Sequence, residues 1–384
     1  MAAIQNAGGP VYQARLIDPV NNQDGGEPGG NIRQAFLFRT DRGLSFVDRP
    51  GGDAITPVGV VAGAGGPELT VSPGRIDPVN NAFNSSRKPL AGEFSFRGDK
   101  LFVVANHFNS KGGDEPLFGR FQPPTLGSEV QRLQQAQLVR TFVESVTALD
   151  PNANIVVLGD LNDFQFSPPL TTLANGLLTI LIDTLPAAER YTYVFDGNSQ
   201  ALDHTLISAG LASRPFTYDV VHANAEFVDQ ISDHDPQVAF LCIDRTAPQL
   251  SVAASPNQLW PPNHQLIPVE VTASASDNSG VAPTVALVSA TSSQPDDGQG
   301  DGDTAGDIVT LTDRSFQLRA ERSGGTSRVY TLTYRATDAC GNATIAATTV
   351  IVPKSQGKAN RSASPLDASG VYWAELMYLP ALER

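Results

Sequence analysis

Several features are scarce in this chain of 384 residues. Its two cysteines, Cys242 and Cys340, are too few for a disulfide-stapled scaffold or a cysteine zinc cluster. No apolar run approaches the roughly 20 residues of a membrane-spanning helix, which excludes an integral helical membrane protein. Acidic residues outnumber basic ones by 40 to 26, and the resulting net charge of −14 excludes a broad basic surface for nucleic acid.

A secretory signal is also missing from the sequence. Residues 1–18 contain no basic segment followed by an apolar core, so we expect no signal peptide in the chain as given. The two cysteines do not decide the compartment, because a chain with so few suits either side of a membrane.

Turn-forming residues, by contrast, are abundant. The chain has 34 glycines and 28 prolines, a composition that favours many turns and β-rich structure over long charged helices. A change of pattern near residues 244–248 divides the chain. We predict one domain over residues 1–245, a second over 246–353, and a polar linker or tail over 354–384 that is disordered.

Helical and strand patterns mix in the first part. A helix is expected from an N-cap at Ser128 to about Leu149, with an apolar face that includes Val130, Phe142 and Val146. Strands are expected at residues 11–18, 31–39, 90–96, 101–108, 154–163, 201–208 and 236–243. The first part is therefore predicted to be a layered α/β domain.

The second part contains only strand-like runs. Seven of them occur, at residues 249–255, 266–274, 284–290, 308–311, 315–321, 329–337 and 344–352. Clusters of Asn, Asp, Gly and Pro separate these runs. Seven alternating strands over about 100 residues are typical of an all-β, immunoglobulin-like sandwich.

Polar clusters follow or open the apolar strands of the first part. They are Asn106-His107, the stretch 159–163 (GDLND), the stretch 202–204 (LDH) and the stretch 232–236 (SDHDP). The ends of such strands converge on one edge of an α/β sheet. Hydrolysis of a phosphodiester needs a base for water, a divalent cation and donors for phosphoryl oxygens, and Asp, Asn and His supply these functions.

These clusters, in this order, resemble the endonuclease/exonuclease/phosphatase superfamily, which contains the DNase I-like nucleases. The motifs NHFNSKGGD, VVLGDLND and SDHDP carry the likeness, which is nearest to bacterial secreted nucleases and covers nearly all of residues 1–243. The resemblance implies a two-layer α/β sandwich, a Mg²⁺ (or Mn²⁺) cofactor and an extracellular location. It further implies nucleic acid as a substrate that is bound without sequence specificity.

The resemblance also implies roles for individual residues. Asp160 would be the base that activates water, and Asn162 would position that water or a phosphoryl oxygen. His107 and His234 would face the scissile phosphate, and Asp203 would hold a histidine in one tautomer.

Two further roles follow from the same likeness. Asp233 would bind the metal ion, and Arg87 would contact the substrate phosphate. Asp163, Asp235, His204 and His222 are interpreted as structural or supporting residues.

The sequence departs from the family near its beginning. Family members start with a strand that bears an Asn and a strand that ends in a metal-binding Glu. Asn6 and Glu27 lie in turn-like stretches, so we expect both functions to be missing. We therefore interpret the first domain as lacking its first strands, with exposed strand edges and apolar surface. Weaker Mg²⁺ binding and a rate loss of about 10²–10³ or more are expected, so this chain is predicted to be weakly active or inactive.

The second part resembles immunoglobulin-like repeats of secreted bacterial proteins. Such repeats often pair a cysteine at the position of Cys340 with one in an upstream DNC motif, which reads Asp-Asn-Ser at 277–279 here. Cys242 is interpreted as a buried core residue, with a Cys242–Cys340 bridge as the alternative. Within the acidic run 296–307, Asp301 and Asp303 are candidate Ca²⁺ ligands, and the alternative is a solvated acidic loop.

Three functions stay open at this stage. The first is a secreted nuclease, for which local basic residues would have to hold the substrate. These residues are Arg33, Arg39, Arg87, Lys88, Lys111, Arg120 and Arg132. The second uses the same site on a phosphomonoester or a phospholipid head group. The third is a secreted adhesion or interaction protein with an inert hydrolase part.

Overall fold

The computed structural model describes residues 2–24, 31–298 and 305–355. The chain divides into two compact units. The first unit comprises Met1–Leu250 together with the short segments Ala275–Val285 and Ala336–Thr344, and the second comprises the rest. Each unit is described by itself below.

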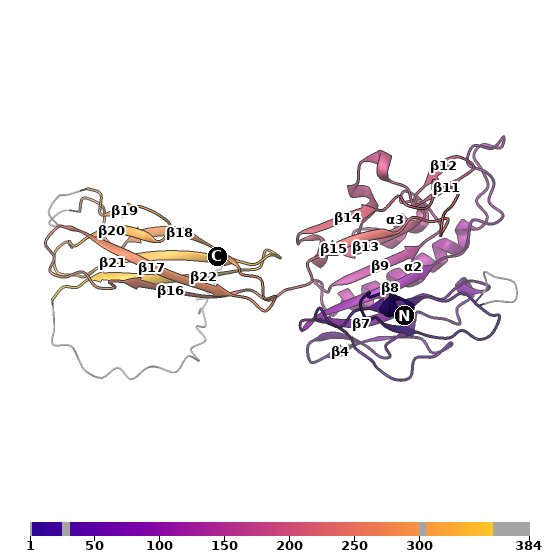
Figure 1. The fold of residues 1–384 in the computed structure, drawn as a ribbon, viewed down its shortest axis with the longest axis horizontal. Coiled ribbons are helices and arrows are strands. Elements are labelled where there is room, and N and C mark those ends of the chain that lie inside the picture. The colour runs from indigo at the N-terminus through magenta and orange to yellow at the C-terminus, as the bar shows by residue number, and fades with distance from the viewer. Residues whose placement is uncertain (1, 25–30, 299–304, 356–384) are drawn as a thin grey trace, which may run out of the picture. The chain divides into compact units, whose positions relative to one another are not determined.

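A mixed sheet forms the framework of the first unit (Figure 1). Its strands follow the order β10-β13-β9-β8-β7-β3, with β6 paired to β7. The bounds are β3 (Leu44–Phe46), β6 (Gly74–Arg75), β7 (Leu90–Phe96), β8 (Asp99–His107), β9 (Ile155–Asp160), β10 (Leu178–Ile180) and β13 (Asp203–Ser208). Neighbouring strands are antiparallel except β8 and β9, which are parallel and are joined through a helix.

Four smaller hairpins and several helices complete the unit. The hairpins are β1 (Gln13–Leu16) with β2 (Ala35–Phe38), β4 (Val60–Gly63) with β5 (Gly66–Leu69), β11 (Tyr193–Phe195) with β12 (Asn198–Gln200), and β14 (Phe216–Val220) with β15 (Gln237–Leu241). The helices are α1 (Ala2–Asn6), α2 (Glu129–Thr147), α3 (Pro168–Ala174) and α4 (Ala209–Ala212), with 3₁₀ turns at Asn81–Phe83, Leu181–Thr184 and Ala187–Glu189. The mixed α/β class predicted from the sequence is thus present.

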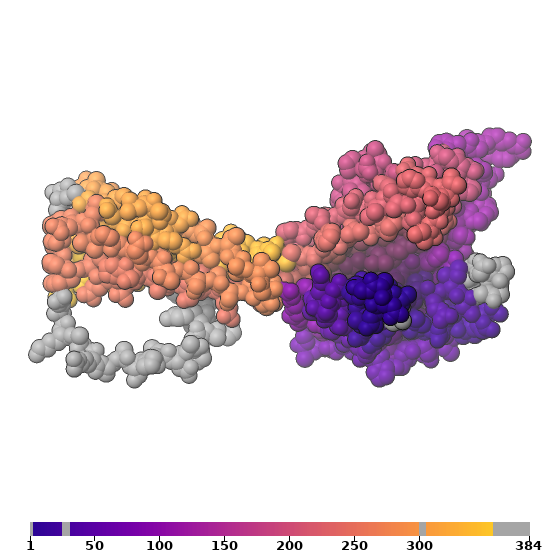
Figure 2. All heavy atoms as spheres, in the orientation of Figure 1, coloured from indigo at the N-terminus to yellow at the C-terminus, as the bar shows by residue number. Residues whose placement is uncertain are grey.

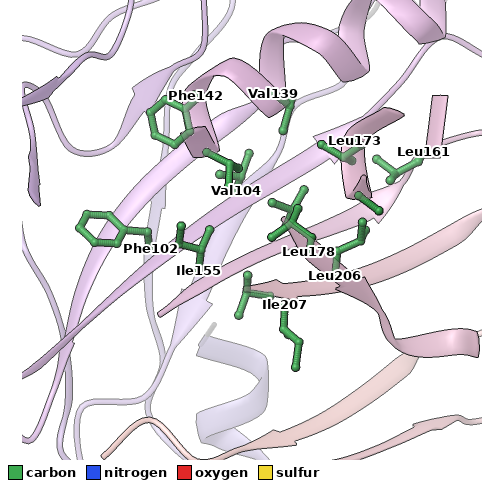
Figure 3. Close-up of a cluster of buried hydrophobic side chains, with 14 of the residues drawn as sticks. Phe102, Val104, Val139, Phe142, Ile155, Leu161, Leu173, Leu178, Leu206 and Ile207 are labelled. Atoms are coloured by element: carbon green, nitrogen blue, oxygen red, sulfur yellow. The ribbon is translucent and has the colours of Figure 1, made fainter. Parts of the chain in front are cut away.

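The main core lies between the sheet and helices α2 and α3. Figure 3 shows Val139 and Phe142 of α2 and Leu173 of α3 facing Val104 and Ile155 of the sheet. All of these side chains are buried. This packing holds β8 and β9 side by side, and with them the residues at their carboxyl ends.

The buried face of α2 differs from the predicted one. Val130 and Leu149 are 62% and 44% exposed, whereas Phe142 and Val146 are buried as expected. The helix also buries the polar residues Arg132 and Gln135. A prediction from apolar spacing alone would leave both residues on the solvent face. Ser128 precedes the helix but does not cap it, because its hydroxyl donates to Asp114 instead.

Hairpin β1–β2 covers the other face of the sheet at β7. Phe36 and Phe38 of β2 meet Phe94 of β7 edge-on, with ring centroids 5.4 and 5.6 Å apart. Figure 2 shows the surface of this unit hollowed between the indigo N-terminal residues and the salmon residues of its later strands. Leu37 of β2 and Phe240 of β15 are 56% and 70% exposed.

The second part of the chain is entirely β-structure among the described residues. Its strands are β16 (Gln249–Ser255), β17 (Leu266–Ser276), β18 (Thr284–Ser292), β19 (Ile308–Thr310), β20 (Ser315–Arg319), β21 (Arg328–Thr337) and β22 (Ala343–Val352). They form a four-stranded sheet, β16-β17-β20-β19, and a three-stranded sheet, β18-β21-β22. Each strand falls on one of the seven runs read from the sequence.

The two cysteines form a disulfide bond. Cys242 and Cys340 are linked across a separation of 98 residues, and both belong to the first unit. The interpretation of Cys242 as a buried core residue was therefore wrong, and the alternative bridge is present. Ser279 fills the place of the expected partner, so only Cys242 was left for Cys340 to pair with.

No helix among the described residues is long and apolar enough to cross a membrane.

Candidate functional site

Strand register brings three predicted site residues into one row. His107 of β8 lies opposite Asp160 of β9, and Asp160 lies opposite Asp203 of β13. Opposed residues on adjacent strands point to the same face, so the three side chains converge. The chain passes closely here: Gly159 has φ +125°, and a Cβ on it would lie 2.0 Å from the Asn106 carbonyl oxygen. Glycine at position 159 is therefore required for His107 and Asp160 to sit side by side.

Asp203 holds His234, which arrives from a distant segment just before β15. The His234 Nδ1 lies 2.5 Å from Asp203 Oδ2. Burial lowers the pKa of His234, but the hydrogen bond and charge of Asp203 outweigh it and raise this pKa to about 9. His234 is therefore an imidazolium at neutral pH, with Nε2 as a proton donor.

Asp160 lies at the centre of the row. Its carboxylate accepts hydrogen bonds from the Asn162 backbone N–H at 2.8 Å and from the Asn162 side-chain amide at 2.9 Å. Asn162 adopts φ +52°, which turns its amide back onto the carboxylate. Burial, followed by the charge of Asp203, raises the pKa of Asp160 to about 7. A carboxylate with such a pKa is suited to take a proton from water near neutral pH.

His107 approaches Asp160 from the other side. Its Nε2 lies 3.4 Å from Asp160 Oδ2, and 30% of the His107 side chain is exposed. Burial and the positive charge of Arg87 lower the pKa of His107 to about 4. His107 is thus neutral at pH 7 and can donate one hydrogen bond without carrying charge.

Arg87 is a buried cation without an ion pair. It is 9% exposed, its Nε has no hydrogen-bond partner, and no carboxylate lies within ion-pair distance of it among the described residues. Burial lowers the pKa of this guanidinium, while the charge of Asp160 opposes that shift. A desolvated guanidinium without a partner is costly, and an anion such as phosphate would satisfy it.

The four supporting residues lie in hydrogen-bond networks near this row. Asp163 pairs with fully buried Arg132 at 2.8 Å. His204 contacts the Asp163 carbonyl at 2.8 Å. Asp235 accepts three backbone N–H groups and contacts His222 at 3.1 Å. These contacts agree with the structural interpretation of the four residues.

The structure also supplies a contact that the sequence did not indicate. The ring of Tyr193, in β11, lies 4.7 Å from the ring of His234, centroid to centroid. Both residues belong to segments brought together by a single β-bridge between them. The available signal in the sequence was weak: Tyr193 stands ten residues before Asp203 of the LDH motif.

A divalent cation would find few protein ligands here. Asp233 is exposed beside His234, and Asp160 is largely buried. Within the part of the chain that the structure describes, Asp233 makes no hydrogen bond or ion pair with another side chain, and Asp160 makes no ion pair with a Lys or Arg. Within the described residues, the site does not hold three acidic or histidine ligand atoms within 4.8 Å of one another. One or two carboxylates nonetheless suit Mg²⁺, which commonly completes its shell with water and phosphate oxygens. Asn6, which the sequence placed in a turn-like stretch, is instead the exposed last residue of helix α1, and Glu27 lies outside the described residues.

The candidate Ca²⁺ ligands Asp301 and Asp303 lie outside the described residues. The structure instead brings together Asp244, Asp277 and Asp338, whose carboxylate oxygens lie within 4.8 Å of one another. Sequence reasoning missed this group because its members are far apart in the chain. Each lies within two residues of Cys242, Ser279 or Cys340, which was the available signal.

Comparison with known proteins gives a family match for part of the chain. Residues 70–235 match the model of the Endonuclease/Exonuclease/phosphatase family. No curated protein matches the chain.

Three solved structures illustrate the similarity. The mannosyl-6-phosphatase Bt3783 of Bacteroides thetaiotaomicron is 18% identical over 62% of this chain and 80% of that chain, with a TM-score of 0.39. Truncated Caenorhabditis elegans TDP2 is 14% identical over 62% and 78%, with a TM-score of 0.40. The human Nocturnin catalytic domain with bound sulfate is 13% identical over 63% and 76%, with a TM-score of 0.39. The stretch that carries Arg87, His107, Asp160, Asp203 and His234 thus matches the Endonuclease/Exonuclease/phosphatase family.

Proposed function

We propose that the first unit is a divalent-metal-dependent phosphodiester hydrolase, a nuclease of the secreted bacterial type that does not read sequence. The observation that carries the proposal is the unpaired, buried guanidinium of Arg87 beside Asp160 and His107. A phosphate bound there would be surrounded by one fixed cation, one imidazolium and one carboxylate of raised pKa. Those groups match the needs of water attack on a phosphodiester.

Each residue then has one role. Asp160 takes a proton from the attacking water, and the Asn162 amide orients that water by holding the Asp160 carboxylate. The His234 imidazolium gives a proton to the oxygen that leaves as the phosphorus–oxygen bond breaks. Asp203 keeps His234 protonated and fixes its ring. Arg87 and neutral His107 donate hydrogen bonds to the non-bridging oxygens, where negative charge gathers.

A bound Mg²⁺ or Mn²⁺, held by Asp233 and by the phosphate, would neutralise further charge on the phosphoryl group. The negative total charge of the protein suits an enzyme that releases its product quickly, since it offers few phosphate contacts. An extracellular location and an immunoglobulin-like second domain over residues 246–353 complete the proposal. Of the predicted tail, residues 356–384 lie outside the described residues.

A binding measurement tests the role of Arg87. Titration of the full chain with vanadate, a phosphate mimic, should give a dissociation constant that rises by about 10-fold or more in Arg87→Met, since a charged hydrogen bond is lost. Arg87→Lys should recover part of the loss. Equal affinity in the wild type and in Arg87→Met would overturn this assignment.

A substrate panel tests the proposed class. Single-stranded DNA should be hydrolysed faster than mannose 6-phosphate or a sphingomyelin analogue when Mg²⁺ is supplied. A faster rate on the monoester or on the lipid would instead assign the same site to the alternative substrates.

A further inference from the structure

A recess opens from the proposed catalytic site. It has a volume of about 620 Å³, and Asn162 and His234 lie among its lining residues. This volume falls within the range of about 300–1,000 Å³ that is typical of small-ligand sites. A phosphoryl group alone is too small to fill such a space, so the recess has room for the group attached to the phosphate.

Two walls of the recess present aromatic faces. One wall is the segment between β8 and α2, which contributes Phe118, and the other is hairpin β11–β12, which contributes Phe195. The two side chains are 83% and 55% exposed, so their ring faces are open to a ligand in the recess. The ring of Phe195 is nearly parallel to that of Tyr193, at 10°, and Tyr193 in turn lies against His234. A line of rings therefore leads from the recess to the phosphate site.

Polar groups between these rings narrow the class of ligand. The Gln200 side-chain amide lines the recess and has no hydrogen-bond partner among the described residues, so one donor and one acceptor group stay available. Asp196 and Glu115 also line it. An acyl chain would have to lie against the charged carboxylates of Asp196 and Glu115, which disfavours a lipid. A simple sugar has no flat ring to stack between two aromatic side chains. A nucleobase combines flat apolar faces with a polar edge and matches both features.

The ion pairs made by the basic residues of the first unit argue against double-stranded DNA as the substrate. Five of the seven basic residues that could hold a nucleic acid already form ion pairs. These pairs are Arg33 with Asp18, Arg39 with Asp41, Lys88 with Asp24, and Lys111 and Arg132 with Asp163. A long anionic backbone would thus find few cations along this surface. A single unpaired nucleoside needs only the recess and the phosphate site.

We infer that the recess binds an unpaired nucleobase of the substrate, stacked by Phe118 and Phe195, so that the site prefers single-stranded nucleic acid over sugar phosphates and lipids. This inference rests on the proposed function. It deepens that function by naming the part of the substrate that supplies binding energy.

Hydrolysis of two oligomers tests the inference. The substrates are a thymidine 12-mer and a 12-mer of abasic tetrahydrofuran phosphates, which has the same backbone charge and no bases. With Mn²⁺ present, the wild type should cleave the thymidine oligomer about 5- to 150-fold faster, the range that corresponds to about 1–3 kcal/mol per stacked base. Phe195→Ala and Phe118→Ala should each reduce this preference, and Phe195→Trp should retain it. Phe240→Ala, at an exposed Phe of β15 outside the recess, is the matched control and should change nothing.

Binding separates failure of this inference from failure of the proposed function. Calorimetric titration with thymidine 5′-monophosphate should give at least about 5-fold tighter binding than ribose 5-phosphate, and the difference should vanish in Phe195→Ala. Base-dependent binding without hydrolysis would support the recess and contradict the proposed hydrolase. Hydrolysis without any base preference, or base-dependent binding that both Phe variants keep, would overturn the inference and leave the hydrolase standing.

Discussion

At the scale of single residues, the site depends on pairs that set each other's protonation. Asp203 and His234 are 31 residues apart in sequence yet lie 2.5 Å apart, and the carboxylate raises the pKa of the imidazole to about 9. Asp160 lies one strand away. Burial and the charge of the same Asp203 raise its pKa to about 7, so this carboxyl group can bind a proton near neutral pH. Asp203 thus supports a proton donor, His234, while Asp160 is poised to accept a proton.

Substitution of Asp203 tests this division of roles. Asp203→Asn should lower kcat on a phosphodiester substrate by at least about 10²-fold, because His234 loses the group that keeps it protonated and oriented. The melting temperature should change little, since an amide keeps the same shape. Asp219→Asn, on the exposed side of β14, serves as the control. Unchanged turnover in Asp203→Asn would contradict the role given to His234.

Motif residues could be predicted at this scale because Asp, Asn and His at strand ends are recognisable by type and order. His107, Asp160, Asn162, Asp203 and His234 all lie in one neighbourhood, as their motifs implied. Tyr193, Phe118 and Gln200 could not be found in this way. Their importance arises from proximity to His234 and to the recess. A Phe in a turn and single residues of a short hairpin have no distinctive sequence signature.

At the scale of elements, helix α2 joins the core to the site. Its apolar residues pack on the sheet, while fully buried Arg132 binds Asp163 at 2.8 Å and Asp114 at 3.1 Å. The helix thereby fixes both the segment after β8 and the turn after β9, which carry Lys111 and Asn162. Charged residues of a helix usually face solvent, but Arg132 faces the protein interior. For that reason the buried face of α2 predicted from its apolar residues was partly wrong.

Removal of the anchor should be costly. Arg132→Leu leaves two buried carboxylates without their partner, and we expect a loss of about 3–5 kcal/mol in the free energy of unfolding. Denaturant titration of the full chain measures it. Arg42→Leu, at an exposed loop position, should cost less than about 0.5 kcal/mol. A small effect of Arg132→Leu would show that the network does not stabilise the fold.

The second part of the chain also contains a buried titratable group, Glu321, which follows β20. Glu321 is fully buried, and its burial, together with a hydrogen bond to Asp307, raises its pKa to about 7. Between about pH 4.5 and 7 the folded chain keeps this proton while the unfolded chain has lost it, so stability must fall as pH rises through that window. The melting temperature of the sandwich should therefore decline from pH 5 to pH 7.5. Glu321→Gln should flatten the decline, and an equally steep decline in that variant would exclude Glu321 as its source.

At the scale of the whole molecule, strand periodicity was predictable after residue 248, and long-range pairing was not. In the first part the short strands β3 to β6, β10 to β12 and β14 were not predicted. The seven runs after residue 248 each became a strand, because alternating apolar residues are a local property. The bond between Cys242 and Cys340 spans 98 residues, and the carboxylates Asp244, Asp277 and Asp338 gather beside it. Such associations depend on how strands are arranged in space, which spacing along the chain does not encode.

The disulfide should contribute to stability. A bond that closes a loop of this length restricts the unfolded chain, and typical native bonds contribute about 2–4 kcal/mol. Cys340→Ser should lower the free energy of unfolding by a comparable amount, and dithiothreitol should reproduce the effect in the wild type only. If reduction leaves the wild-type unfolding curve unchanged, the bond does not stabilise the chain.

The central claim is that this site hydrolyses phosphodiesters, and cleavage of single-stranded DNA by the 384-residue chain tests it most directly. The account predicts cleavage with Mg²⁺ or Mn²⁺ that stops with EDTA and falls at least about 10²-fold in Asp160→Ala, even if the rate is low because few protein ligands hold the metal. Cleavage that persists in EDTA, or that proceeds at the same rate in the wild type and in Asp160→Ala, would contradict the account.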